Sequence, residues 1–230
     1  MDIYNNTANT NQNVYDTYNK FVFSDDTRVF NKMIKKTELY VLVKDLLGDI
    51  VEFGVFKGSG MALYLKLKGM YEPNSLTKII GFDYFEPTVL LDTLDGKNKE
   101  MMQNVLSRVD QTELTIDSVN TRLSVFNKSD YMLIKGDAVI ESEKYYNSHK
   151  GARIKILYMD LDLGKPTYNI LKHLWNKVVE NGIIVLDEYA FHSWDESDGV
   201  DMFLREIRGQ YTLVNTQIFS PSLYIKKIVT

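Results

Sequence analysis

Along most of this chain, apolar segments typical of buried strands alternate with segments of helical periodicity. The strand-like segments are DIVEFGV (49–55), KIIGFDYF (78–85), YMLIKGDA (131–138), IKILYMDLDL (154–163) and GIIVLDEY (182–189). Helical segments are expected at 59–71, 97–128, 141–148, 167–180 and 197–208. Strands that alternate with helices form mostly parallel sheets that are covered on both faces. The alternation therefore predicts a doubly wound α/β fold.

The chain ends with two further strand-like segments, YTLVNTQIF (211–219) and SLYIKKIV (222–229). Too few residues lie between them for a parallel crossover, so the two segments predict an antiparallel hairpin. We expect the last segment to lie beside the strand at 182–189. The predicted fold class is thus α/β, with a doubly wound, mostly parallel seven-stranded sheet whose last strand is antiparallel.

At 230 residues the chain is long enough for one domain with a single core. Residues 1–23 are expected to form a polar arm, because the first twenty residues hold six Asn and show no helical or strand period. A helix is expected from Ser24 to Gly48, and residues 24–230 form the single predicted domain. A helical insertion near 88–130 interrupts the alternation, and it either closes over a site as a lid or packs beside the sheet.

Composition and charge argue against several classes of protein. The net charge is −4 and there is no dense basic cluster, which argues against binding to nucleic acid. The sequence has no Cys, so disulfides and thiolate chemistry are excluded. It shows neither an apolar run long enough to cross a membrane nor the pattern of a signal peptide. These features predict a soluble, cytoplasmic protein with no membrane or nucleic-acid partner.

Acidic residues follow the predicted strands at the edge of the sheet where parallel strands end. Asp160 and Asp162 occupy alternate positions of one strand-like segment, which predicts that their carboxylates leave the same face. Asp187 and Glu188 end the next strand, its expected neighbour. Four carboxylates in one small volume need a cation, and oxygen ligands favour Mg²⁺, with Ca²⁺ or Mn²⁺ as alternatives. The other interpretation is that some of these acids cap helices or stay protonated.

The segment EFGVFKGSG (52–60) joins the first predicted strand to its helix, where a nucleotide-like cofactor binds in such folds. It matches neither the dinucleotide-binding pattern nor a phosphate-binding loop, because its glycines and its lysine do not have the required spacing. Gly54 and Gly58 still allow the backbone to pass close to a ligand that lacks phosphates. Asp83, at the end of the second strand, is placed to accept hydrogen bonds from ribose hydroxyls. Together with the antiparallel last strand, this turn favours S-adenosylmethionine over a dinucleotide.

Several of these segments occur in an order that is typical of one known family. They are DIVEFGVFKGSGMALYL, IIGFDYFEP, LIKGDAVIES, YMDLDLGKPTYNILKHLWNKVVENGIIVLDEY and GVDMFLRE, from about Gly48 to Glu206. They resemble the macrocin O-methyltransferases, which are class I, Mg²⁺-dependent enzymes that mostly methylate sugars and other hydroxylated natural products. The most specific part is the D-x-D pattern followed by the acidic pair of the next strand. The resemblance implies a methyltransferase that acts on a hydroxyl of a sugar or a sugar-containing small molecule.

The resemblance also implies roles for individual residues. In the family, the first Asp of D-x-D and the two acids of the next strand hold the metal, and the second Asp is the proposed general base. The expected metal ligands are then Asp160, Asp187 and Glu188, and the expected catalytic base is Asp162. The family usually has Asp where this chain has Glu188, and Arg where it has Lys57. The expected cofactor-binding residues are Glu52, Gly54, Gly58, Ser59, Asp83, Gly136 and Asp137.

Three alternatives stand beside this interpretation. The first keeps the fold and the cofactor but methylates an amine, a carboxyl or a phospho-group, and the sequence does not separate it from O-methylation. The second is a non-catalytic nucleotide- or sugar-binding module, against which the second Asp beside a metal argues. The third, a dinucleotide oxidoreductase, is disfavoured by the missing pyrophosphate pattern. The expected partner is a small-molecule acceptor, a sugar or nucleotide-sugar, and a homo-oligomer is compatible with the sequence.

Overall fold

The computed structural model describes residues 12–192 and 194–228, and its centre is a seven-stranded sheet. The strands are β1 (Asp49–Phe53), β2 (Ile79–Asp83), β3 (Tyr131–Lys135), β4 (Ile154–Met159), β5 (Val178–Leu186), β6 (Tyr211–Asn215) and β7 (Leu223–Lys227). Their order is β3-β2-β1-β4-β5-β7-β6. β1 to β5 are parallel, and β7 is antiparallel to both β5 and β6. The predicted fold class is confirmed, as are the terminal hairpin and the place of its last strand beside β5.

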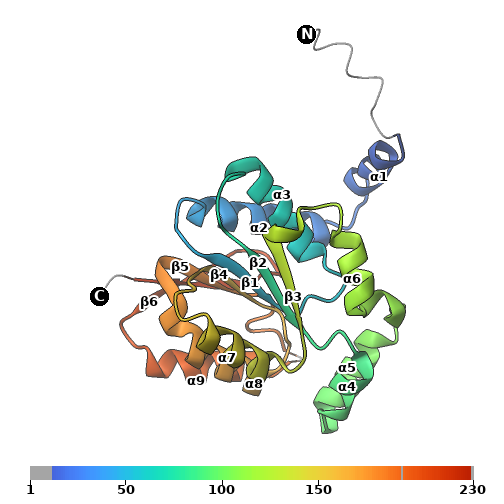
Figure 1. The fold of residues 1–230 in the computed structure, drawn as a ribbon. Coiled ribbons are helices and arrows are strands. Elements are labelled where there is room, and N and C mark those ends of the chain that lie inside the picture. Colours follow the sequence, from blue (N-terminus) through green and yellow to red (C-terminus); the bar gives the residue numbers. More distant parts are fainter. Residues whose placement is uncertain (1–11, 193, 229–230) are drawn as a thin grey trace.

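Helices cover both faces of this sheet (Figure 1). They are α1 (Gln12–Val22), α2 (Arg28–Val43), α3 (Ser59–Tyr71), α4 (Pro87–Asp92), α5 (Gly96–Leu106), α6 (Ile116–Leu123), α7 (Ala138–Ser148), α8 (Gly164–Leu174) and α9 (Glu196–Glu206). Short 3₁₀ helices lie at η2 (Gln111–Leu114), η3 (Lys128–Asp130) and η4 (Trp175–Lys177). α7, α8 and α9 pack on one face, and α2, α3 and α6 pack on the other. Within the described part of the chain, no helix has the length and apolar character needed to cross a membrane.

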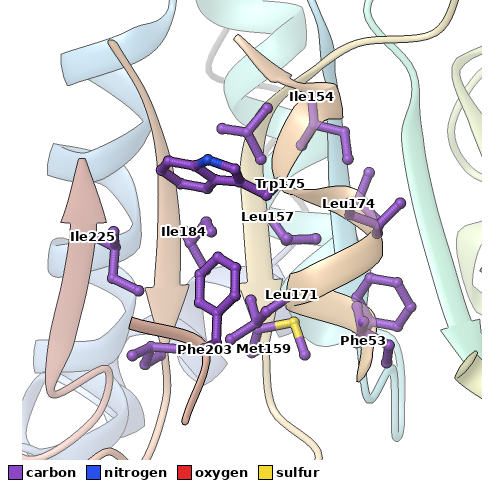
Figure 2. Packing of buried hydrophobic residues seen from close by; sticks show 14 of the residues in the cluster. Phe53, Ile154, Leu157, Met159, Leu171, Leu174, Trp175, Ile184, Phe203 and Ile225 are labelled. Carbon is purple, nitrogen blue, oxygen red and sulfur yellow. The ribbon is translucent and has the colours of Figure 1, made fainter. Parts of the chain in front are cut away.

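The alternation of side chains along the central strands divides the core into two layers. On β4, Leu157 and Met159 belong to the layer under α8 and α9, where Figure 2 shows them with Leu171 and Phe203. Tyr158, between them in sequence, belongs to the layer under α2 and α3. Each of these side chains is almost completely buried, and each buried residue of this size stabilises the fold by roughly 1.5–3 kcal/mol. Packing on both faces therefore fixes the edge of the sheet from which the site residues project.

β4 ends earlier than the sequence pattern predicts. Its last residue is Met159, so Asp160 and Asp162 lie in the following loop and not in the strand. Asp162 has a left-handed backbone with a φ of 63°, which no strand residue adopts. The prediction that the two carboxylates leave the same face of a strand is therefore wrong. The acids reach one region because the chain turns there, as the site geometry below shows.

Two helix predictions also need correction. Val178 to Glu180 were expected in a helix, but they open β5, because η4 ends the preceding helix at Lys177. The arm at 1–23 was expected to have no helical period, yet its described part holds α1, while residues 1–11 lie outside the described residues. The missed signal is the helical spacing of Val14, Tyr15 and Tyr18, which are all exposed. α1 has no buried residues and lies away from the sheet (Figure 1).

The insertion near 88–130 divides into two parts that behave differently. α6 packs against the sheet, because Val119 and Leu123 belong to the same core layer as α2 and α3. α4, α5 and η2 instead form a small cluster of their own around Met102, Leu106 and Leu114. The insertion therefore packs beside the sheet at one end and leaves a separate helical unit at the other.

Candidate active site

A cavity of about 720 Å³ opens at the carboxyl ends of the strands. It is bounded by the loops after β1, β2, β3 and β4, and by α4 and α5 of the insertion on the far side. The sheet order reverses between β1 and β4, and this switch point is where ligands bind in open parallel sheets. The cavity is thus the candidate active site, with the helical unit α4–α5 as one of its walls.

The turn after β1 approaches the loop after β4 closely. Gly54 has a φ of 86°, and a side chain at this position would overlap the backbone carbonyl of Asp160. Only glycine satisfies both conditions, which lets the two loops meet at the edge of the cavity that both of them line. Gly54 lines the cavity, as the sequence predicts for a residue close to a bound ligand.

Asp83 fastens this turn from the end of β2. Its carboxylate accepts hydrogen bonds from the backbone N–H groups of Val55 at 2.9 Å, Phe56 at 2.9 Å and Phe85 at 3.0 Å. Burial raises the pKa of Asp83, and these three donors act in the opposite direction. The backbone of Tyr84 acts in the same direction as these donors, so the carboxylate that lines the cavity is held in place by the turns on both sides of it.

The other predicted cofactor residues divide into two groups. Asp137 lines the cavity, and its side chain caps α7 through the N–H groups of Val139 at 2.9 Å and Ile140 at 3.1 Å. It also accepts a hydrogen bond of 2.8 Å from the hydroxyl of Tyr84. The residues that do not line the cavity are Glu52, Gly58, Ser59 and Gly136. Glu52 instead forms a buried ion pair of 2.8 Å with Lys36 of α2.

Asp160 lines the cavity and Asp187 does not, but the two carboxylates share one positive charge. The ammonium group of Lys32, on α2, lies 3.3 Å from Asp160 Oδ2 and 2.8 Å from Asp187 Oδ2. Asp187 also accepts hydrogen bonds from the hydroxyls of Ser220 and Tyr158. Burial alone would lower the pKa of Lys32, but the two carboxylates outweigh it and raise the pKa. The predicted ligand pair is therefore brought together, with a lysine between its members.

Asp162 and Glu188 face each other at the same edge. Burial and the charge of Glu188 raise the pKa of Asp162 well above its ordinary value. Burial also raises the pKa of Glu188, and the hydrogen bond with Asp162 opposes this shift. Two carboxyl groups in contact cannot both stay ionised without a cation, so the pair holds a proton. Among the described residues, Asp162 Oδ1 and Glu188 Oε2 have no hydrogen-bond partner.

Glu196 is a fifth acid that the sequence interpretation missed. It is the first residue of α9 and has an exposed fraction of 0%. Neither of its carboxyl oxygens has a hydrogen bond of ordinary geometry within the described chain. Burial raises its pKa well above the usual value, and the charges of Asp160, Asp187 and Glu188 add to the shift. An acid at a helix start is common, so the sequence offered no sign that this one is buried.

These observations test whether a divalent cation fits the site. The donors are of the right kind, because buried carboxylate oxygens without partners are suitable ligands for a hard cation. As the side chains lie, however, no three acidic or imidazole groups in residues 12–192 and 194–228 converge on one point. The position between Asp160 and Asp187 holds Lys32. The donor set fits a cation, and binding one requires Lys32 and Glu188 to move.

The sequence of this chain matches the profile of a known family. Residues 26–213 match the family described as macrocin-O-methyltransferase (TylF). This span includes the turn after β1 and the five acids described above, of which Asp160 and Asp162 line the cavity. Among curated proteins, none matches this chain significantly.

Solved structures of methyltransferases share the fold. The apo structure of CalS11, described as a TDP-rhamnose 3'-O-methyltransferase of calicheamicin biosynthesis, has 21% identity, covers 97% of this chain and 88% of its own, and gives a TM-score of 0.68. The O-methyltransferase NovP has 18% identity, with 86% and 80% covered and a TM-score of 0.66. The O-methyltransferase TomG from Streptomyces achromogenes, solved with S-adenosylmethionine, has 11% identity, with 94% and 96% covered and a TM-score of 0.55. At these identities the likeness concerns the fold.

Proposed function

The chain belongs to the macrocin O-methyltransferase family, and on that premise we propose that it methylates a hydroxyl of a sugar or sugar-containing small molecule. The methyl donor is S-adenosylmethionine. The observation that carries the proposal is the cavity itself, which places the turn after β1 and the loop with Asp160 and Asp162 around one space. A donor and an acceptor held on opposite sides of that space meet without crossing solvent. The absence of a basic cluster supports a small-molecule acceptor over nucleic acid.

The β1–β3 side of the cavity is the proposed cofactor side. Asp83 lines the cavity and takes a ribose hydroxyl there, while Gly54 lets the backbone approach the methionine part. Asp137 holds Tyr84 beside the same space and fixes the start of α7. Four further residues expected to bind the cofactor do not line the cavity and support this side indirectly. They are Glu52, Gly58, Ser59 and Gly136.

The β4–β5 side is the proposed acceptor side. Asp160, Asp187 and Glu188 hold Mg²⁺ or another hard divalent cation, which supplies a Lewis acid that makes an acceptor hydroxyl more acidic. Asp162 accepts the proton from that hydroxyl as the general base. Burial and the neighbouring acids raise its pKa in the metal-free protein, so neutralising those acids favours the ionised form that a base requires.

The proposal is tested with purified protein, S-adenosylmethionine, Mg²⁺ and a panel of acceptors. The panel includes nucleotide-sugars, free sugars with neighbouring hydroxyls, amines and carboxylates, and methylated products are measured by mass spectrometry. We expect transfer to a sugar hydroxyl that is lost after thorough chelation and restored by Mg²⁺. Transfer to an amine or a carboxylate would replace the proposed acceptor class. Full activity after chelation would overturn the role of the metal.

A further inference from the structure

Lys32 lies at the point where two proposed metal ligands meet. Its ammonium group contacts both Asp160 and Asp187, at 3.3 Å and 2.8 Å. We propose that Lys32 is the resident counter-cation of this carboxylate pair, and that a divalent cation binds only in competition with it. The inference rests on the proposed metal dependence, and it adds a residue of α2 that controls how the site is loaded.

The position of Lys32 explains why its ammonium group and a divalent metal ion exclude each other from the site. A metal ion held by Asp160 and Asp187 needs the oxygens that Lys32 contacts, and like charges repel strongly where carboxylates are buried. Asp187 is 4% exposed, so the pair is poorly screened by water. An ammonium group supplies hydrogen bonds and charge to the pair when no metal is present, which prevents two carboxylates from facing each other alone.

Comparison with Lys36, one turn further along α2, shows which lysine is free to leave. Lys36 has a side chain that is 4% exposed, forms a buried ion pair with Glu52, and lies 3.7 Å from the centre of the Tyr158 ring. The side chain of Lys32 is 34% exposed and lies 5.9 Å from the same ring centre. Lys36 is therefore held by Glu52 and the Tyr158 ring and is closed off from solvent. Lys32 has a path to solvent along which its flexible stem carries the charge away.

α2 provides the setting for this exchange. It packs against both β4 and β5, so its side chains reach the carboxyl ends of the strands that carry Asp160 and Asp187. Before it, α1 has no buried residues, and Thr27 gives α2 no side-chain cap. The first turns of α2 therefore depend on contacts made by their own side chains. These contacts include the ion pairs of Lys32 with Asp160 and Asp187. Metal binding then releases one of the contacts that hold the start of this helix.

The test is a titration of the full-length metal-free protein with Mn²⁺, followed by calorimetry and by the electron paramagnetic resonance of free Mn²⁺. The variant is Lys32→Met, which keeps the length of the side chain and removes its charge. Lys35→Met is the matched control, because Lys35 lies on the same helix and pairs with Glu38, away from the site. We expect Lys32→Met to bind Mn²⁺ at least tenfold more tightly than the wild type, and Lys35→Met to bind like the wild type.

The outcomes separate this inference from the proposed function. Equal Mn²⁺ affinity in the wild type and Lys32→Met overturns the competition and leaves the metal site standing. Absence of Mn²⁺ binding in both proteins overturns the metal site and the competition together. Binding by Lys32→Met where the wild type binds weakly or not at all supports the competition, since removing one lysine then creates the affinity.

Thermal unfolding provides a second readout that does not depend on activity. Lys32→Met leaves Asp160 and Asp187 without a counter-charge, so the metal-free variant should unfold at a lower temperature than the wild type. Mn²⁺ should then raise its unfolding temperature more than it raises that of the wild type, because only the folded variant binds the metal tightly. Lys32→Gln, which keeps a donor without the charge, should behave in the same direction. Variants that stay unfolded at saturating Mn²⁺ would show that Lys32 has a structural role instead, and would overturn the proposal.

Discussion

On the β1–β3 side of the cavity the acidic side chains accept hydrogen bonds from backbone N–H groups, whereas on the β4–β5 side they face mainly one another. Asp83 and Asp137 accept three and two backbone hydrogen bonds. Asp162, Glu188 and Glu196 bury oxygens that have no partner within the described chain. All of the acids named in this comparison follow strands or begin helices at the same edge of the sheet.

The difference shows what each side requires from a ligand. Asp83 and Asp137 are already ordered by donors that do not leave, so the cofactor side needs no ligand to hold its shape. On the acidic side, Lys32 balances one pair only, and burial together with the charges of their neighbours raises the pKa of the remaining acids. That side changes its charge state when a cation binds. The following predictions test this contrast, beginning with the largest expected effect.

Asp162→Asn should lower kcat by roughly 10²–10⁴, the usual contribution of general base catalysis. The amide keeps the shape of the carboxyl group and cannot take the proton of the acceptor hydroxyl. Mn²⁺ affinity should change little, and steady-state kinetics with a titration of metal measures both quantities. The control is Asp110→Asn, an exposed cap of η2 where Asn serves equally well. Turnover close to that of the wild type would mean that water removes the proton and that Asp162 only orients the ligands.

Asp187→Ala should destabilise the protein by roughly 1–3 kcal/mol, the cost of leaving hydrogen-bond partners unsatisfied. Asp187 is 4% exposed and accepts hydrogen bonds from Lys32, Ser220 and Tyr158, all of which would lose their acceptor. Urea unfolding measures the change, and metal affinity should be lost as well. Asp45→Ala, in an exposed pair with Lys44, is the control and should change neither. A loss below about 1 kcal/mol would show that the ion pair between Asp187 and Lys32 contributes little to the free energy of unfolding.

Asp83→Ala should weaken the binding of S-adenosylhomocysteine by roughly 1–3 kcal/mol, the cost of leaving polar partners unsatisfied. The carboxylate orders the turn through Val55 and Phe56 and lines the cavity where the ribose is proposed to bind. Mn²⁺ affinity should stay at the wild-type value, because the metal is proposed to bind on the β4–β5 side and Asp83 lies on the other side. Calorimetry with each ligand tests both statements. Unchanged nucleoside binding would remove Asp83 from the cofactor side.

The sequence predicts the architecture well because hydrophobic alternation determines it. β1 to β5, α3 and the hairpin of β6 and β7 lie where the pattern places them, since each strand is apolar and each turn is marked. The prediction fails at the start of β5, where the residue types do not distinguish a helix from a strand. Val178 is apolar in either a helix or a strand, so only the packing of β5 decides its state.

The candidate site was predictable only in part, for a different reason. Asp160, Asp162, Asp187 and Glu188 follow strands, so topology alone brings them together. Lys32 and Glu196 come from helices that reach the site through tertiary packing, and a lysine or glutamate on a helix is usually exposed. The backbone of Asp162 also departs from the strand pattern, which no spacing of residues reveals.

The free energy of unfolding should depend on pH because of the buried acids on the β4–β5 side. Burial and nearby like charges raise the pKa of Asp162, Glu188 and Glu196 above their values in the unfolded chain. A group with a raised pKa contributes stability that is fully present below its unfolded value, about 4 for these acids, and is lost as pH rises through the folded value. The folded pKa of Asp162 is about 10, so metal-free protein should lose stability as pH rises from about 4 to about 10. Urea unfolding with and without Mg²⁺ measures this loss, which bound metal should reduce.

Glu196→Gln isolates one member of this group and is expected to have the smallest effect. Below its raised pKa Glu196 keeps its proton, so the amide replaces a neutral group of the same size and should change stability by less than about 1 kcal/mol. Above that pKa the metal-free variant should be more stable than the wild type, because it has no proton to lose. The control is Glu206→Gln at the other end of α9, where Tyr168 and Lys172 lower the pKa and no gain at high pH is expected. If Glu196→Gln gains nothing at high pH, Glu196 has a partner that balances its charge, and the two sides of the cavity differ less than their hydrogen bonds indicate.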